Sequence, residues 1–122
     1  MIIPFIYSQN LVFNGDFSAG NSGFTSDYGF VNAPNVTGAQ GKIGVVTNPN
    51  AWLSTNSNCG DHTSGSGNMM VVDGSIANAG NDMVYFQAVP VTPNKNYSFS
   101  YWVQSLNNQN FASLETLING GS

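Results

Sequence analysis

The chain has 122 residues, of which 7% are charged, and two Lys and Arg against six Asp and Glu give a formal net charge of -4. This length suits one domain, whose core can bury roughly two-thirds of the surface of the unfolded chain. The chain lacks a basic patch that would neutralise phosphates or hold it to an anionic membrane, which argues against nucleic acid and membranes as partners. The single cysteine, Cys59, excludes an internal disulfide.

The chain begins MIIPFIYSQN, an apolar run that turns polar at Ser8. The run is far too short to span a bilayer, and it lacks the basic residues that open a signal peptide. We interpret residues 1–8 as the tail of a signal peptide whose start is missing, and residues 9–122 as the mature domain of a secreted or cell-surface protein. The alternative is that residues 1–8 form a first edge strand.

The rest of the chain shows the pattern of short strands separated by turns. Gly and Asn interrupt every long window, so no helical spacing of apolar residues appears. Strand signals recur instead, bounded by turn residues. The predicted strands are residues 10–14, 28–31, 43–47, 68–72, 83–89, 96–104 and 112–119.

Two of these strands predict how the sheets are layered. Residues 69–72 are apolar on both faces, so we expect a central strand that is covered on both sides. Residues 96–104, NYSFSYWVQ, alternate instead, so that one face is apolar and the other is rich in Ser and carries Trp102. The apolar face predicts contact with a core and consists of Tyr97, Phe99, Tyr101 and Val103.

The turn VTPNKN joins residues 83–89 to residues 96–104 and predicts that the two strands are antiparallel neighbours. Several short strands with turns between them favour an all-β, antiparallel sandwich. At the end of the chain, LETLINGG contains Asn119-Gly120, a strong hairpin signal, but no return strand follows it. The sequence therefore predicts a domain that stops before its C-terminal strands and leaves the edge at 114–119 open to association.

Five stretches resemble galactose-binding-like jelly-roll domains, a group that includes many carbohydrate-binding modules. NLVFNGDFSAGNSGFTSDY resembles their first strand and glycine-rich turn, and VYFQAVPVTPNKNYSFSYWVQ resembles their paired central strands. GDHTSGSGNMMVVDG occupies the place of their loop into a core strand, and GFTSDYGFV with GKIGVVTNPNAW is similar to a subgroup of Bacteroidetes-type bacterial surface proteins. The resemblance covers most of residues 10–120, but the family's last strands are absent.

The resemblance implies an antiparallel jelly-roll β-sandwich and a non-catalytic, carbohydrate-binding-like module within a larger protein with other domains. Many members of the family also hold a structural Ca²⁺ near the first strand. By resemblance, Asp16 is the best acidic ligand here, with Asn14 as a helper. The alternative is an Asx turn, in which the Asp16 carboxylate accepts a hydrogen bond from the backbone two residues on.

The motif GDHTSGSGNMMVVDG, residues 60–74, gathers residue types that hydrolases use. Asp61 and His62 are adjacent, however, and neighbours on an extended loop point in different directions, so Asp61 cannot readily orient His62 as a triad requires. Neither a G-x-S-x-G motif nor a P-loop lysine is present, and one histidine excludes H-E-x-x-H zinc chemistry. We therefore expect no enzyme, and a polar loop shaped by Asp61 and Thr63 capping backbone N–H groups.

Three aromatic residues are candidates for stacking against a sugar ring: Trp102, Trp52 and Tyr85. Asp61 and His62 are the polar candidates beside them. The alternative for each aromatic residue is burial, because large aromatic side chains usually pack in a core. The sequence thus favours glycan docking by aromatic stacking, and its alternative is a structural or adhesive spacer domain without a small ligand. The two hypotheses differ in whether Trp102 and Trp52 are exposed together or packed away.

Overall fold

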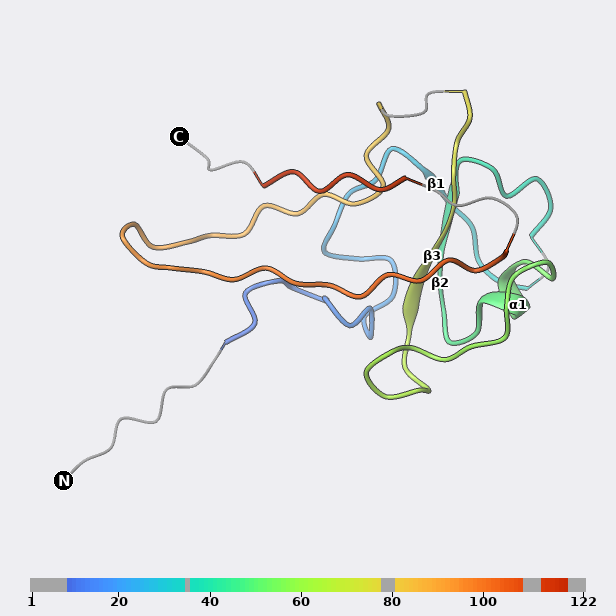
Figure 1. Cartoon of the computed structure of the whole chain (residues 1–122), viewed down its shortest axis with the longest axis horizontal. Helices are drawn as coiled ribbons and strands as arrows, with labels where there is room; N and C mark the ends of the chain where they lie inside the picture. The colour runs from blue at the N-terminus through green and yellow to red at the C-terminus, as the bar shows by residue number, and fades with distance from the viewer. Residues whose placement is uncertain (1–8, 35, 78–80, 109–112, 119–122) are drawn as a thin grey trace.

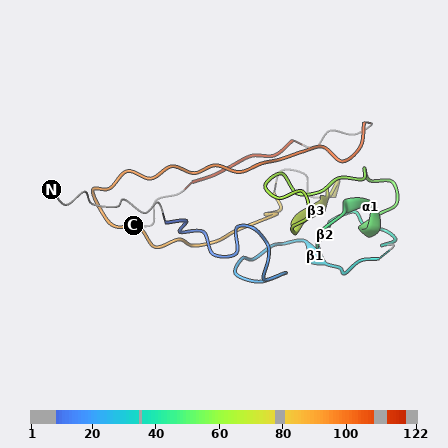
Figure 2. The same cartoon turned by 90° about the horizontal axis from the view of Figure 1, so that it is seen from below.

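The computed structural model describes residues 9–34, 36–77, 81–108 and 113–118. This part of the chain is a small β-type fold with one short helix. Its elements are β1 (Gly29–Phe30), β2 (Lys42–Val46), α1 (Pro49–Trp52) and β3 (Met69–Asp73). The sheet and helix occupy one end of the molecule, and long extended segments run from it toward the other end (Figures 1 and 2).

The three strands form one mixed sheet in the order β1-β2-β3. β1 pairs with β2 in parallel, and β2 pairs with β3 antiparallel over five residues, from Lys42 opposite Asp73 to Val46 opposite Met69. β2 is rich in β-branched residues, which favour strands. It is therefore β2, flanked on both sides, that forms the centre of the sheet.

The core lies on one face of the sheet, around Trp52. This side chain is fully buried, and its Nε1–H donates to the Val31 carbonyl oxygen at 2.9 Å. The indole lies directly over Gly44 in β2, where a side chain would collide with its Nε1 and Cδ1 atoms. Buried residues that pack with it are Val36, Ala39, Val46 and Val71.

α1 places Trp52 in that position. Asn48 caps the helix, because its Oδ1 accepts from the Asn50 N–H at 3.1 Å, and Pro49 occupies the first turn, where no N–H is needed. The helix begins three residues after Val46, so the indole folds back onto the strand that precedes it. No helix in the described residues has the length and apolar character to cross a bilayer.

Three strand predictions are confirmed: those at 28–31, 43–47 and 68–72 correspond to β1, β2 and β3. The strand predicted at 10–14 is wrong, because the chain turns there. Asn14 and Phe17 have φ angles of 53° and 56°, and the Phe17 N–H donates to the Asn14 carbonyl oxygen at 3.0 Å. In the 83–89 region only Phe86 forms a β-bridge, to Thr25.

The strand predicted at 96–104 is also wrong: the segment is extended, but none of its backbone groups forms a hydrogen bond with the described residues. In Figure 2 it diverges from 83–89 after the turn, so the two segments are not paired neighbours. Its apolar face is about half exposed rather than packed against a core. Residues 113–118 likewise form no strand, and the rest of the strand predicted at 112–119 lies outside the described residues.

The position predicted for 69–72 is wrong as well. β3 is at the edge of the described sheet, and Val71 is 1% exposed whereas Val72 is 36% exposed. Among the described residues, β3 has a paired strand on one side only, β2, and on the face opposite Trp52 its Val72 is part exposed although the paired Ile43 of β2 is buried. The predicted signal-peptide tail at 1–8 and the hairpin signal at 119–120 lie outside the described residues.

Candidate functional site

Two candidates separated by 40 positions in the chain meet in the structure. The imidazole of His62 and the indole of Trp102 stack with ring centroids 3.5 Å apart and an interplanar angle of 13°. Trp102 nevertheless remains 74% exposed, since His62 covers one face of the indole only. The result is a flat aromatic surface directed toward solvent.

A short anchor fixes the C-terminal end of the segment that carries Trp102. The carbonyl oxygen of Leu106 accepts hydrogen bonds from the N–H and the hydroxyl of Ser57, both at 2.8 Å. The Leu106 side chain packs against the Trp52 core. Trp102 therefore lies only four residues from a point that is tied to the sheet.

His62 belongs to a loop that Asp61 shapes, residues 61–67, which we call the Asp61 loop. The Asp61 carboxylate accepts from the backbone N–H groups of Thr63 at 3.0 Å, Ser64 at 2.7 Å and Gly67 at 2.5 Å, and from the Ser64 hydroxyl at 2.7 Å. Gly65 has a φ angle of 76°, which suits glycine, and its N–H donates to the Asp61 carbonyl oxygen. One carboxylate thus closes the whole turn.

These donors also set the charge of Asp61. Its hydrogen bonds to the Ser64 side chain and backbone, then to Gly67 and Thr63, lower the pKa of the carboxyl group from 3.8 to about 2. The charged form is occupied by four donors, so it has little capacity left for a ligand. The prediction that Asp61 caps backbone N–H groups is confirmed, whereas Thr63 takes part through its own N–H and caps nothing in the described residues.

His62, which stacks on the indole, belongs to a loop whose other polar side chains are exposed. Neither imidazole nitrogen of His62 forms a hydrogen bond with a described residue, and His62, Thr63 and Ser66 are exposed. An exposed indole stacked on an imidazole whose nitrogens are available can hold a ring that is apolar on its face and polar at its edge. Pyranose rings have this character.

Trp52 does not join this surface. It is 0% exposed, and its only polar atom is already bonded to Val31. The interpretation of Trp52 as a ligand-stacking residue is therefore wrong. The alternative is correct, because the Trp52 side chain is buried in the core. The physical reason is that α1 directs it onto Gly44, the one position in β2 where the sheet has no side chain.

Tyr85 is also packed away from Trp102. Its ring stacks on Phe24, with centroids 5.1 Å apart and an angle of 23°, and meets the edge of Phe17 at 6.4 Å. Burial raises the pKa of its hydroxyl, which has no hydrogen-bond partner among the described residues. Tyr85 thus belongs to a local aromatic cluster and is not a stacking platform.

Asp16 and Asn14 shape the first turn. Asp16 Oδ1 accepts from the Ser18 N–H at 3.1 Å and the Ser18 hydroxyl at 2.8 Å, which is the Asx turn, and these bonds lower the pKa of Asp16. Asn14 Oδ1 accepts from the Ala19 N–H at 2.8 Å, and its Nδ2 donates to the carbonyl oxygens of Gly20 and Ser22.

Calcium requires about six to eight oxygen ligands. In this conformation the oxygens of Asp16 and Asn14 hold the turn, and only Asp16 Oδ2 is without a hydrogen bond to the described residues. No group of three or more His, Cys, Asp or Glu that could hold a metal occurs in the part of the chain that the structure describes. The two residues in their present arrangement do not fit a calcium site.

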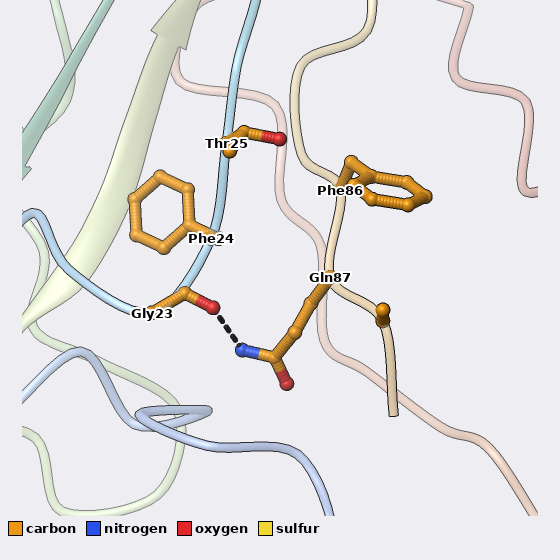
Figure 3. A pocket seen from close by; sticks show the side chains of 6 residues that line it. Gly23, Phe24, Thr25, Phe86 and Gln87 are labelled. Atoms are coloured by element: carbon orange, nitrogen blue, oxygen red, sulfur yellow. Dashed lines mark hydrogen bonds between the residues drawn. The ribbon is translucent and has the colours of Figure 1, made fainter. Parts of the chain in front are cut away.

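A shallow hollow of about 270 Å³, which no sequence pattern predicts, lies between residues 23–25 and 86–88 (Figure 3). Two polar side chains line it, Thr25 and Gln87, and Gln87 donates through Nε2 to the carbonyl oxygens of Gly23 and Phe13 and accepts from the Phe13 N–H. Its hydrogen-bonding capacity holds the loops together. The Thr25 hydroxyl is the polar side-chain group of the lining that remains available to a ligand.

Comparisons with protein-family models, with curated proteins and with solved structures found no match for this chain. The geometry of the His62–Trp102 pair is thus the main guide to function.

Proposed function

We propose that this chain is a non-catalytic glycan-docking module, in which the exposed indole of Trp102 stacks on a pyranose ring. The observation that carries the proposal is the pairing of Trp102 with His62, which orients a largely exposed indole. Exposed aromatic surface normally finds a partner, and one that is held in place loses little conformational entropy on binding. Asp61 and its loop act as the support for His62.

The resemblance to galactose-binding-like carbohydrate-binding modules supports the same function, with an antiparallel jelly-roll sandwich as the proposed complete architecture. It also supports a place in a secreted or cell-surface bacterial protein with further domains. A polysaccharide is accordingly the proposed partner. Calcium enters only as a variable of the experiment below, because the described residues around Asp16 do not assemble its ligands.

The test is a tryptophan-fluorescence titration of the chain against a panel of soluble polysaccharides, with Ca²⁺ and then with chelator. We expect a saturable shift with at least one glycan, because a sugar on the indole changes its contact with water. Trp102→Ala abolishes the shift, and His62→Ala weakens binding about tenfold through loss of the stacked support.

The matched control is Phe13→Ala, which removes another exposed aromatic ring, 63% exposed, from the N-terminal loop. This variant should bind as the parent chain does. If no glycan shifts the emission of a chain whose circular dichroism shows it to be folded, the alternative function, a structural or adhesive spacer domain, replaces the proposal. A shift that survives in Trp102→Ala would move the site away from the stacked pair.

A further inference from the structure

Residues 96–104, which we call the aromatic segment, are extended and lack any backbone hydrogen bond to the described residues. Their only contacts of this kind are through side chains: the Tyr97 hydroxyl accepts from the Thr92 N–H at 2.8 Å, and the Tyr101 hydroxyl lies 2.7 Å from that of Thr116. An extended chain with unpaired N–H and C=O groups is a template for another strand.

The segment lacks the features that protect such an edge. Natural edge strands carry charges, proline or bulges that prevent pairing with another chain. Between Tyr97 and Gln104 there is no charged residue and no proline. The rings of Phe99 and Tyr101 lie on the same side of the segment, with centroids 5.6 Å apart. A strand that pairs with this segment would therefore place its side chains beside an uninterrupted row of uncharged residues.

The pattern of the segment is complementary to itself. If two copies pair antiparallel about Ser100, Phe99 of each copy lies opposite Tyr101 of the other. In the same register Tyr97 lies opposite Val103, and the small Ser98 lies opposite the bulky Trp102. Directly opposite side chains are on the same face of an antiparallel pair, and aromatic pairs in these positions stabilise it. All four apolar side chains of each copy then share one face.

The apolar side chains of this region are extensively exposed. The side chains concerned, in the aromatic segment and in the neighbouring residues 113–118, are each about half to three-quarters exposed: Tyr97, Phe99, Tyr101, Trp102, Val103, Leu114, Leu117 and Ile118. Pairing through the aromatic segment joins these exposed apolar side chains, other than Trp102, into one surface across the two copies.

We infer that the chain forms a homodimer, in which the aromatic segments of two copies pair antiparallel about a two-fold axis at Ser100. The occupant is a second copy because this register places apolar opposite apolar at 97–103 and 99–101, small opposite large at 98–102, and no charge opposite another charge. Trp102 is on the opposite face from Phe99 and Tyr101, so pairing leaves its outer face open to solvent.

Sedimentation over a concentration series tests the inference with the whole chain. We expect the mass to rise from that of the 12.9 kDa monomer to twice that value as concentration increases. Ser100→Asp places two carboxylates opposite each other on the axis and should weaken the dimer about tenfold or more. The matched control, Ser54→Asp in the exposed loop after α1, should dimerise as the parent does.

A charge exchange makes the register falsifiable. Ser100→Lys alone should also be monomeric, because the two lysines lie opposite each other on the axis and repel. An equal mixture of Ser100→Asp and Ser100→Lys should form the heterodimer, because the opposed charges then attract. Circular dichroism establishes that each variant is folded. A parent chain that stays monomeric up to about 100 µM, well above the dissociation constants of standard interfaces, overturns the inference and leaves a strand of another protein as the occupant. The inference is also overturned if the mixture fails to dimerise, or if Ser100→Asp leaves the dimer unchanged.

Discussion

Asp61 shows how one carboxylate organises a loop that contains almost no apolar residue. Its two oxygens satisfy three backbone N–H groups and one hydroxyl within seven residues of chain. These bonds exist only while the carboxylate is charged and accepts in every direction. The position of His62, and with it the support of Trp102, thus depends on the ionisation of a residue that does not contact the indole.

This dependence predicts an acid transition of the Asp61 loop. The folded pKa of Asp61, about 2, is below its ordinary value of 3.8. The stabilisation is therefore complete above about pH 5 and is lost as the pH falls through the folded pKa. We expect the carboxyl carbon of Asp61 to titrate in NMR with a midpoint near 2, together with the amide proton of Gly67.

Asp61→Asn provides the control for that titration. The amide keeps the shape of the side chain but accepts through one oxygen only, so the Gly67 amide shift should lose its acid transition. A midpoint near the ordinary value of an aspartate in the parent chain would show that the four donors do not hold the charged form.

At the scale of elements, α1 and β2 together determine where the Trp52 side chain packs in the core. Trp52 fits because Gly44 leaves a gap in β2, and Asn48 and Pro49 set the start of the helix that delivers the indole. The close approach of an indole to a strand backbone is possible only at glycine. Gly44 is therefore as important to the core as the tryptophan it accommodates.

Gly44→Ala should destabilise the fold by about 1–3 kcal/mol, because the added methyl group collides with the Trp52 ring and forces it or the strand to shift. Chemical denaturation monitored by the emission of Trp52, in a Trp102→Phe background, measures the change. Gly74→Ala is the matched control, since a methyl group there meets nothing within 4 Å. Equal stabilities of the two variants would contradict the packing described for Gly44.

The sequence predicted the strands that pack next to a local core, and it failed where a strand needs a distant partner. β2 and β3 were anticipated from their β-branched runs, and the Asp61 turn from its residue types. The aromatic segment has a stronger strand pattern than either, yet it forms no ladder, because alternation cannot supply the neighbouring strand. The stacking of His62 on Trp102 joins residues far apart in the chain, and no local pattern encodes such a contact.

At the scale of the whole molecule, hydrogen bonding is uneven. The sheet, the turns and the bridge between Thr25 and Phe86 contain backbone pairing, whereas residues 96–104 are held by side-chain hydrogen bonds (Figures 1 and 2). Backbone amides without a partner exchange with solvent at rates close to those of an unfolded chain. The described part of the chain should therefore divide into a protected and an unprotected region.

Hydrogen exchange followed by mass spectrometry tests this division. Peptides from β2 and β3 should be protected at every concentration, whereas residues 96–104 should exchange rapidly in dilute solution and gain protection as the dimer forms. The Ser100→Asp variant separates the two effects, because it should remain unprotected in this segment at high concentration. Slow exchange of the aromatic segment in a demonstrated monomer would contradict the absence of backbone partners there.

The route of the chain between β2 and β3 has a consequence for how the protein folds. Residues 47–68 must close into a loop before Lys42 can lie opposite Asp73. The chain loses conformational entropy in closing this loop before the strand pairs can stabilise it. α1 and the Asp61 turn each form from contacts a few residues apart, so they shorten the flexible length that remains. We therefore expect the turn that Asp61 orders, which also positions His62, to speed the pairing of β2 with β3 during folding.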